Sequence, residues 1–585
     1  MERIKYLRII FFYMKLARIN VSRKSIEYEE ITSDSKFFLL GARGLSSRII
    51  LDEVPPNCDP LGEHNKLILA NGLLTGSTFP CSARTSVGAK SPLTNGIKEA
   101  NVGGRPSLML AQHGIRALIF DGISSELIYI LIEDGILSIH SAEEYKGLGN
   151  YELHSELLEK FGKDVGIYSI GPAGELLMKA ASVAANDLEG YPSRHAGRGG
   201  LGAVMGSKGV KAVVVLPKKG SEVKMHDLKS FTAITKPFAK LLAESKEGFS
   251  TYGTALAMKL MSEYGGLPTK NYRMGSYENV QDISGEKLHD IVITRGGKKR
   301  LACSPTCVIR CSNFYVDDKG NHVTSSLEYE TMSLCGSNLM LENLDDVASI
   351  DHLCDDIGID TIEFGVTIGV GMDSGRIKWG DANKIFEILE EIRRGSDIGR
   401  LYGNGVCNLG IEVNHSRIPQ VKGQGLSGYD PRVFKGIGLT YATSPMGADH
   451  TAGCAIAGRV ASQTKDYGAL TENNGKFDLS FELQLYTTIL DSMGCCYFIG
   501  PSFENMEIVS GALNAMHGIE LTRDDLIKIG VDILKFELEF NEKAGLGKDT
   551  NEIPSFFRDE PSKPTDLTYT FSSEDLKDFW KRLEM

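Results

Sequence analysis

Three closely spaced cysteines are the residues of this sequence best suited to holding a metal. Cys303, Cys307 and Cys311 follow a C-x3-C-x3-C spacing. Pro305 keeps the first gap out of regular helix, so we expect the first sulfur to come from a loop and the other two from a turn or a helix start. Most iron–sulfur cubanes need four cysteine thiolates. A fourth ligand must therefore come from another part of the chain.

The composition indicates a large globular protein of ordinary polarity. The chain has 585 residues, 42% of them hydrophobic and 24% charged. A chain of this length exceeds one hydrophobic core, and we expect about two to four domains. The formal net charge of -12 argues against nucleic acid or an anionic membrane as the main partner. The 64 glycines indicate tight turns and close backbone approaches to a large ligand.

The cysteine content indicates a reducing compartment. The eleven cysteines are odd in number and clustered, unlike a secreted disulfide scaffold. We therefore expect a cytoplasmic protein with a thiolate-ligated metal. No run of about 18 apolar residues is present that could span a membrane, and the short apolar run at 7–14 has no cleavage site after it. Residues 1–13 are interpreted as a terminal extension, with Met14 as an alternative start.

Residues 14–218 are patterned as strands separated by glycine-rich turns. Two helical periods interrupt them, at 150–161 and 174–185. The prominent loops are 41–45, 81–84 leading to 91–94, 101–104 and 194–202. The expected strands are short apolar or β-branched runs at 37–40, 67–70, 117–120, 127–132 and 211–216.

From about residue 219 the pattern becomes helical. The cysteines lie in the middle of this region, with a strand expected directly after them at 313–316. Apolar positions recur with the helical period at 226–243, 254–264, 343–356, 361–372, 382–394, 480–493, 504–516 and 523–541. We therefore expect an α+β fold, with a β-rich base domain at 14–218 and two mainly helical domains at 219–420 and 421–585.

The loop at 194–202 contains a G-x-G-x-x-G pattern at Gly197, Gly199 and Gly202. A nicotinamide-binding Rossmann site needs a full helix after such a loop. Too few residues separate Gly202 from the next expected strand for a crossover helix to fit. A backbone nest for another phosphate is favoured, because Arg194 and Arg198 stand among the glycines.

Two segments share a D-x-x-G pattern that follows an amphipathic helix. One runs from Asp355 through Gly358 to Asp360, and the other from Asp491 through Gly494 to Cys496. Each glycine stands where a left-handed residue would end the helix. An aspartate in the last turn opposes the helix dipole. Two ordinary helix ends remain one interpretation, and a pair of binding sites is the other.

Together these segments resemble the aldehyde:ferredoxin oxidoreductase family of tungsten enzymes. The resemblance runs from about Lys15 to beyond Gly500, and the shared order of the motifs makes it specific. The motifs are Arg-Gly-Leu at 43–45, Ser-Pro-Leu-Thr at 91–94, Ala-Val-Met-Gly-Ser-Lys at 203–208, the cysteine loop, Glu-Tyr-Glu-Thr at 328–331 and both D-x-x-G segments.

The resemblance implies a tungsten, or molybdenum, bound through two pterin dithiolenes. Asp355 and Asp360, with the turn at Gly358, would serve one pterin. Asp491 and Cys495, with the turn at Gly494, would serve the other. Carboxylates suit this task because they accept hydrogen bonds from pterin N–H groups.

The resemblance also supplies the missing cluster ligand. Cys496 matches the family cysteine that completes a [4Fe-4S] cluster with Cys303, Cys307 and Cys311. Arg84 matches an arginine between cluster and pterin, where its planar fork can bridge the two.

A magnesium ion is implied between the pterin phosphates, held by the backbone carbonyls of Asn101 and His195. Carbonyl and phosphate oxygens suit this hard cation. The residues expected to hold phosphate are Gly103, Arg194, Gly197, Gly199, Gly200 and Gly202.

Glu330 and His450 are the expected catalytic residues, because they match the family's glutamate and histidine close to the metal. Glutamate can act as a base for water, and histidine can donate to an aldehyde oxygen. Glu328, two residues from Glu330, is the competing candidate.

Two features depart from the family pattern. The first two family cysteines are spaced C-x2-C, whereas this chain has C-x3-C, which places it in a different branch and leaves the substrate open. Radical-SAM enzymes use C-x3-C-x2-C, which does not match the last gap here. Ser349 stands where an acidic ligand for a subunit-bridging metal would be sought, so no fixed dimer is inferred and a homo-oligomer stays open.

The resemblance implies oxidation of an aldehyde to a carboxylic acid with oxygen from water. Electrons would pass through the cluster to ferredoxin or an iron–sulfur partner subunit. One alternative keeps the cofactor but reduces a non-aldehyde substrate, such as an aromatic thioester. Another, from a different class, is a non-catalytic electron carrier with a lone cubane, which the duplicated D-x-x-G segments disfavour.

Overall fold

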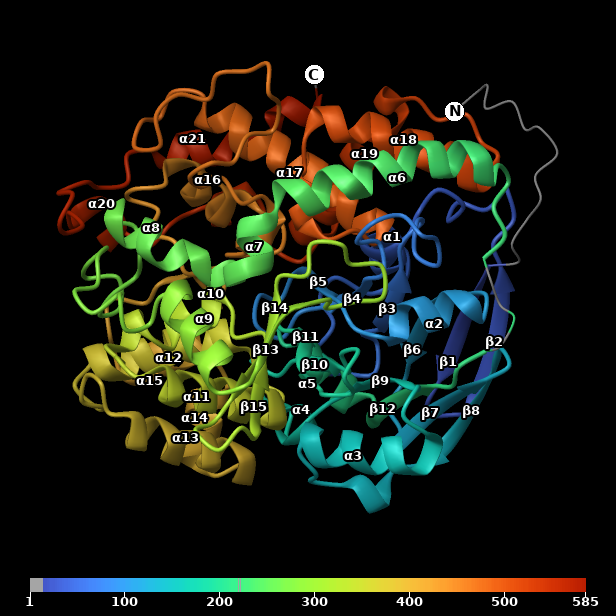
Figure 1. The fold of residues 1–585 in the computed structure, drawn as a ribbon, viewed down its shortest axis with the longest axis horizontal. Helices are drawn as coiled ribbons and strands as arrows, with labels where there is room; N and C mark the ends of the chain where they lie inside the picture. The colour runs from blue at the N-terminus through green and yellow to red at the C-terminus, as the bar shows by residue number, and fades with distance from the viewer. Residues whose placement is uncertain (1–13, 219, 221–222, 585) are drawn as a thin grey trace.

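The structure is a computed structural model that describes residues 14–218, 220 and 223–584. The expected extension at 1–13 lies outside these residues. The large sheets occupy the right of Figure 1 (blue to cyan), the helices of the middle of the chain lie at the left (yellow), and the C-terminal helices lie along the top (orange to red). The expected α+β class is confirmed. The division at 218 and 420 stays a prediction.

The first sheet has six strands in the order β2-β1-β6-β3-β4-β5. Its neighbours pair antiparallel except β1 and β6, which are parallel. Residues of both faces are buried along the central strands. Strands β3 and β6 are accordingly almost continuous apolar runs, whereas β4 is buried throughout although it is rich in small and polar residues. The strands are β1 (Lys15–Asn20), β2 (Ser25–Glu30), β3 (Leu67–Asn71), β4 (Thr85–Lys90), β5 (Ile97–Val102) and β6 (Ile115–Asp121).

The second sheet also has six strands, in the order β11-β10-β9-β12-β7-β8. One face packs on the first sheet's core and the other on helix α3 (Asn150–Phe161). The strands are β7 (Ile128–Glu133), β8 (Ile136–Ser141), β9 (Gly166–Ser169), β10 (Val183–Ala185), β11 (Arg194–Ala196) and β12 (Val210–Val215). The helices among the strands of the two sheets are α1 (Ala42–Glu53), α2 (Pro106–Gln112), α4 (Pro172–Glu175) and α5 (Leu201–Ser207).

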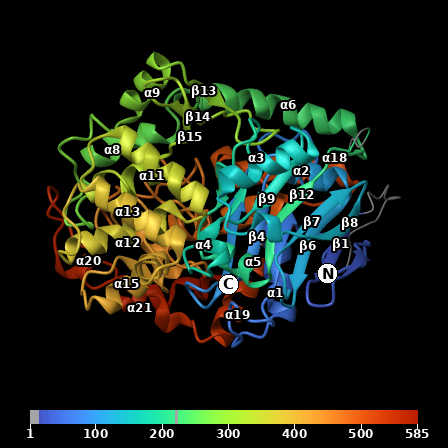
Figure 2. The same cartoon turned by 90° about the horizontal axis from the view of Figure 1, so that it is seen from below.

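The rest of the described chain is mainly helical, and Figure 2 shows its middle helices on the side opposite the strands. The helices are α6 (Leu228–Ser245), α7 (Glu247–Tyr252), α8 (Ala257–Glu263), α9 (Gly285–Thr294), α10 (Tyr329–Leu334), α11 (Leu344–Ile357), α12 (Thr361–Asp373), α13 (Ala382–Arg394), α14 (Asp397–Gly403), α15 (Val406–Glu412), α16 (Lys435–Thr443), α17 (Lys476–Met493), α18 (Phe503–His517), α19 (Arg523–Lys543), α20 (Phe556–Asp559) and α21 (Ser573–Lys577). The small strands are β13 (Lys298–Leu301), β14 (Ser312–Val316), β15 (His322–Ser325), β16 (Gln420–Val421) and β17 (Gln424–Gly425). Of the described helices, none combines the length and apolar character needed to cross a membrane.

Several local expectations are wrong, each at a short element. Residues 37–40 form a turn rather than a strand, and the loop at 41–45 is the start of α1. The segment 174–185 ends α4 and then enters β10, because its buried alanines join the second sheet. Short apolar runs suit a helix or a strand equally, and tertiary pairing decides between them.

The loop at 194–202 does not belong to a Rossmann unit, although a short helix does fit after it. That helix, α5, fills the gap that seemed too small for one. Strands β11 and β12 are separated by β10 and β9, and all three pairings between them are antiparallel. A parallel strand-helix-strand crossover, which a Rossmann unit requires, is therefore absent here.

Both D-x-x-G segments end a helix as expected. Gly358 ends α11 and Gly494 ends α17, each with a φ of 76° in the left-handed region. Each turn also packs against a glycine beside one sheet. A Cβ on Gly72, after β3, would lie 2.0 Å from the backbone N of Gly494, and one on Gly171, after β9, would lie 2.3 Å from the carbonyl oxygen of Ile357. Each sheet thus contacts one of the two D-x-x-G turns through the backbone of a glycine.

We predict that Gly72→Ala lowers the thermal unfolding midpoint by several degrees. The added methyl must displace the Gly494 turn, and overpacking of this kind costs about 1–3 kcal/mol. Gly248→Ala is the matched control, because no atom lies within 4 Å of its Cβ position and alanine is favoured within a helix such as α7. Scanning calorimetry at one scan rate compares the two, and equal midpoints would contradict the close approach.

Candidate active site

A cavity of about 570 Å³ lies where the sheets meet the helical regions. This volume is typical of cofactor and ligand sites. The expected site residues that line it are Arg84, Asn101, Gly103, Arg194, His195, Gly197, Cys303, Cys311, Glu330, Asp355, Asp360, His450, Asp491 and Cys496. Those not in its lining are Gly199, Gly200, Gly202, Cys307, Gly358, Gly494 and Cys495. The structure therefore brings together residues that span most of the sequence.

Glu330 and His450 face each other in this cavity. Glu330 stands in the first turn of α10, and His450 begins the short helix η4 (His450–Ala452). The Gly428 N–H donates to one Glu330 oxygen, Oε2, at 2.7 Å. The other, Oε1, lies 3.4 Å from His450 Nε2 and has no hydrogen-bond partner. One carboxylate oxygen is anchored, and the other is free to act on a bound molecule.

The electrostatic surroundings of this pair favour proton exchange. Burial raises the pKa of Glu330, while the neighbouring His450 acts in the opposite direction. Burial alone would raise the pKa of Asp449, but Lys98 and Arg198 hold it well below its usual range. The Asp449 carboxylate lies 2.5 Å from Lys98 Nζ. His450 therefore follows a fixed ion pair, which orients the start of η4.

Three of the four expected cluster cysteines, Cys303, Cys311 and Cys496, line the cavity, and Cys307 lies close to Cys311 outside that lining. Cys303, Cys307 and Cys311 all lie in the loop between β13 and β14. The Cys307 N–H donates to the Ser304 carbonyl at 3.1 Å, so of the expected turn or helix start the structure has the turn. Cys496 precedes the short helix η5 (Tyr497–Ile499). Burial raises the pKa of the Cys311 thiol, and the other three sulfurs raise it further, which shows that all four are electrostatic neighbours.

The spacing of these sulfurs does not suit a single metal ion. Among the described residues, no three His, Cys, Asp or Glu side chains lie close enough together to bind one ion. In a cubane each thiolate ligates its own iron, so the four sulfurs need not converge on one point. The arrangement fits a multi-iron cluster better than a mononuclear site. Arg84 Nη1 lies 3.9 Å from Cys303 Sγ, close enough to offset the charge of such a cluster.

A backbone strip at 81–83 ties the cysteine segments together. The N–H of Cys81 donates to the Thr306 carbonyl at 2.8 Å, and the N–H groups of Ser82 and Ala83 donate to the Thr306 hydroxyl at 3.0 and 3.1 Å. The carbonyl of Cys81 accepts from the Cys496 N–H at 2.9 Å. Thr306 lies between Cys303 and Cys307, which is the gap that is one residue longer here than in the family pattern. The longer gap therefore contains the residue that binds the strip.

The cavity wall carries buried polar atoms that have no hydrogen-bond partner within the protein. They are Glu99 Oε1, Asn101 Nδ2, Arg194 Nε and Arg198 Nε, together with Glu330 Oε1 and His450 Nδ1. Buried polar groups are nearly always hydrogen-bonded. At Gly103 the backbone itself forms part of the wall. A Cβ there would lie 3.3 Å from both Arg84 Nη1 and the Cys303 carbonyl oxygen, so a side chain would fit only tightly. These features fit a large polar cofactor with anionic groups.

The expected pterin-binding carboxylates differ in how free they are. Asp360 caps α12, accepting from the N–H groups of Ile362 and Glu363 at 3.0 and 3.2 Å. Asp355 lies 3.1 Å from His195 Nε2. Burial raises the pKa of Asp491 to about 6, against the charge of Arg43. Asp355 and Asp491 are the better placed to accept from a ligand.

Sequence reasoning missed several buried charged residues around the cavity. Burial, followed by the charge of Asp491, raises the pKa of Glu99 to about 8. Arg43 forms a buried ion pair with Glu537 of α19, at 2.8 Å. Asp351 accepts from Thr324 and Thr331 beside the first motif. The local signal was weak, because Glu99 lies within a strand and Arg43 was assigned to a loop.

The fork of Arg198 is already engaged by the protein. Its two terminal nitrogens donate to the carbonyls of Gly425 and Ala448. This leaves Arg194 as the freer guanidinium of the glycine loop, since one of its terminal nitrogens donates to Ser312 at 2.7 Å and its Nε has no partner.

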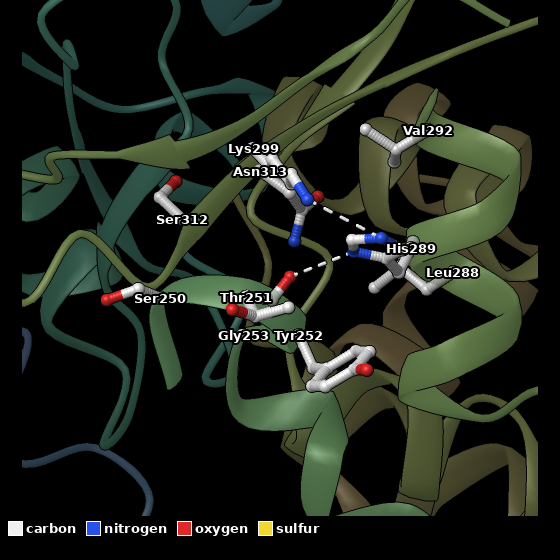
Figure 3. A pocket seen from close by; sticks show the side chains of 10 residues that line it. All are labelled: Ser250, Thr251, Tyr252, Gly253, Leu288, His289, Val292, Lys299, Ser312 and Asn313. Atoms are coloured by element: carbon white, nitrogen blue, oxygen red, sulfur yellow. Dashed lines mark hydrogen bonds between the residues drawn. The ribbon is translucent and has the colours of Figure 1, made fainter. Parts of the chain in front are cut away.

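A second hollow, of about 10 Å³, is lined in part by Ser312 and Asn313, which directly follow the cysteine loop (Figure 3). His289 stands there between the Thr251 carbonyl, at 3.1 Å, and Lys299 Nζ, at 3.5 Å. A space of this size holds about one water molecule. It cannot accommodate a substrate.

We predict that Thr306→Val speeds the loss of iron from the protein by several-fold. Valine keeps the shape but leaves the N–H groups of Ser82 and Ala83 without an acceptor, which costs about 1–3 kcal/mol. Thr306→Ser keeps the hydroxyl and is the control. Iron release to a ferrous chelator measures the effect, and equal rates in both variants and the parent would show that the strip does not hold the site.

A solved structure has the same fold. A chain of the "Active site complex BamBC of Benzoyl Coenzyme A reductase in complex with 1,5 Dienoyl-CoA" superposes with a TM-score of 0.81, covering 99% of this chain and 95% of that chain at 19% identity. At this identity the likeness supports the fold alone.

Curated relatives match over nearly the whole chain. The tungsten-containing aldehyde ferredoxin oxidoreductase of Pyrococcus furiosus is 32% identical over 568 residues, covering 94% of this chain and 91% of the relative. The protein of the same name from Thermococcus kodakarensis is 31% identical, with the same coverage. An aliphatic sulfonate oxidoreductase, WOR-like subunit, from Pyrococcus furiosus is 25% identical, covering 94% and 90%.

Family models match both parts of the chain. Residues 16–217 match the N-terminal domain of aldehyde ferredoxin oxidoreductase, and residues 233–583 match domains 2 and 3. The motifs quoted from the sequence lie within these ranges, and the cavity is built from both. The chain belongs to the aldehyde ferredoxin oxidoreductase family.

Proposed function

We propose that this protein oxidises an aldehyde to a carboxylic acid by means of a tungsten, or molybdenum, bis-pterin cofactor. The observation that carries the proposal is the free Glu330 oxygen beside His450, in a cavity that cysteines also line. The names of the curated relatives support the metal and the substrate class. The balance is one aldehyde plus one water giving one carboxylic acid, two electrons and two protons.

The cofactor would supply the two-electron redox chemistry, which protein side chains cannot. Asp355 and Asp491 would accept from the N–H groups of its two pterins, and Arg84 and Arg194 would lie beside its anionic parts. A magnesium ion would lie near the carbonyls of Asn101 and His195. The carbonyl of Asn101 already accepts from Arg84 Nη2 at 3.2 Å, so a cation there would share it.

The protein's own residues handle binding and protons. Glu330 Oε1 would take a proton from water, and His450 Nε2 would donate to the carbonyl oxygen of the aldehyde. The Gly428 N–H keeps the Glu330 carboxylate in place during this exchange. The rings of Tyr329 and Tyr429, which stack at 4.9 Å, line the cavity beside Glu330.

The electrons would leave through a [4Fe-4S] cluster held by Cys303, Cys307, Cys311 and Cys496. Arg84 lies between these cysteines and the cavity, and its pKa is raised by the nearby Cys496 and Cys303 despite burial. Ferredoxin or an iron–sulfur partner subunit would accept the electrons singly.

An alternative keeps the cofactor and reverses the chemistry, with reduction of an aromatic thioester. The aromatic side chains that line the cavity favour it, among them Tyr429, Tyr497, Phe249 and Phe498. Anaerobic assays of one preparation with an aldehyde and with a benzoyl thioester discriminate the two. Under the third hypothesis, a non-catalytic electron carrier with a lone cluster, the protein would convert neither the aldehyde nor the thioester.

We predict that anaerobically purified protein contains about one tungsten or molybdenum and about four irons per chain, as one mononuclear metal and one cubane require. Elemental analysis by mass spectrometry measures both. Cys496→Ser should lower the iron content, because it removes one of the four expected thiolate ligands. Iron without tungsten or molybdenum would reject the catalytic proposal.

Glu330→Gln is expected to retain its metals and lose turnover by about 100-fold or more, the usual contribution of a positioned general base. The amide keeps an acceptor for the Gly428 N–H but cannot take up a proton. Glu328→Gln tests the competing candidate. Glu328 also lines the cavity, but it is 46% exposed, accepts from Ser326 and lies 3.6 Å from Arg194 Nη1, so this variant should keep most of its turnover. A viologen-linked aldehyde assay compares them. Full activity in Glu330→Gln would remove this residue from the mechanism.

A further inference from the structure

Two cations of the cavity have no carboxylate partner. Lys246 joins α6 to α7, and Arg459 lies in the loop after η4. Both side chains line the cavity. Within the described part of the chain, neither forms an ion pair, whereas the buried Lys98 and Arg43 do. Burial lowers the pKa of Lys246, and the charge of Arg459 lowers it further, so the two cations lie near enough to repel each other.

Aromatic rings hold these two cations in place. The Arg459 guanidinium lies 5.2 Å from the ring centre of Tyr497 and 5.6 Å from that of Phe498. The Lys246 ammonium lies 6.0 Å from the ring of Phe249, and the rings of Phe249 and Phe498 are 4.9 Å apart. Cation–π contacts orient a charge without neutralising it. These two positive charges therefore remain uncompensated within the protein, and an anionic ligand could neutralise them.

The cation pair and the catalytic pair share one continuous wall. The Tyr429 ring lies 5.9 Å from that of His450, and Tyr429 also lies within electrostatic range of Arg459. The Cys454 thiol is an electrostatic neighbour of both Arg459 and Glu330. A single ligand could therefore reach from the free Glu330 oxygen to the cations, passing Tyr429 and Cys454.

Charge compensation of the cysteines is a weaker explanation for Arg459. Arg84 already lies beside Cys303, and Arg194 interacts with Cys303 and Cys311. For Arg459, the Tyr497, Cys454 and Tyr429 side chains are stronger electrostatic neighbours than Cys496. Its position is thus better matched to the cavity than to the cysteine loop.

We propose that Lys246 and Arg459 bind an anionic group at the end of the substrate remote from the carbon that reacts. The preferred substrates are then aldehydes with an apolar or aromatic body and a carboxylate, sulfonate or phosphate at the far end. The planar fork of arginine suits such oxyanions, and lysine adds a point charge. The inference rests on the proposed aldehyde oxidation, because it assigns the other end of that substrate.

The test compares benzaldehyde with 4-carboxybenzaldehyde on the holoenzyme. For the carboxylated substrate, Arg459→Gln should raise KM by about ten- to a hundredfold, the usual effect of losing a charge-assisted hydrogen bond, with kcat nearly unchanged. Lys246→Gln should act in the same direction. Benzaldehyde kinetics should be unaffected. Lys299→Gln is the matched control, because Lys299 faces His289 outside the cavity. The sulfonate and phosphate analogues identify the preferred anion.

A binding measurement separates this inference from the proposed function. Calorimetry with terephthalate and with benzoate should show tighter binding of terephthalate, and Arg459→Gln should abolish the difference. Should the enzyme oxidise no aldehyde, the proposed function fails, yet Arg459-dependent terephthalate binding would still support the anion site. Unchanged KM and unchanged terephthalate binding in both variants would overturn it while aldehyde oxidation stands. A shifted cluster potential in Arg459→Gln without a change in KM would also overturn it.

Discussion

The close approach of bare backbone to the two D-x-x-G turns is the constraint on which the rest of the structure depends. Gly72 meets the turn at Gly494, and Gly171 meets the turn at Gly358. Each contact joins one sheet to the end of one helix, at distances that leave no space for a side chain. Since each turn follows an aspartate that lines the cavity, the two contacts set how far the helical regions stand from the sheets. They therefore set the width of the cavity.

A second backbone contact connects this scaffold to the cysteines. The strip at 81–83 hydrogen-bonds to Thr306 on one side and to Cys496 on the other. Arg84 follows the strip directly and reaches Cys303 and Asn101. The wall that would conduct electrons and the wall that would hold the cofactor are thus parts of one hydrogen-bonded unit. Any shift of the strip would move both together.

Charge is distributed unevenly around the cavity. On the side of the sheets, buried charges are balanced by partners, as in the pairs of Lys98 with Asp449 and Arg43 with Glu537. At the α6–α7 junction, Lys246 and Arg459 have rings beside them instead. Paired buried charges keep their side chains in place, because removing one partner would leave the other as an uncompensated buried charge. Unbalanced charges are available to a ligand. This contrast distinguishes residues that build the site from residues that recognise what enters it.

Local patterns were enough to predict much of this protein. The long amphipathic helices, the glycines that end α11 and α17, and the cysteine spacing all follow from residues close together in the sequence, since helix periodicity and left-handed caps are local properties. The order of the motifs likewise indicated the family. Short elements were less predictable, as 37–40 and 174–185 show, because such runs take their form from the sheet they join. Only the tertiary structure decided that Glu330 faces His450, that Thr306 holds the strip at 81–83, and that Lys246 and Arg459 line the same cavity. These residues are far apart in the chain, and their contacts depend on how the sheets and helices dock, which no local pattern encodes.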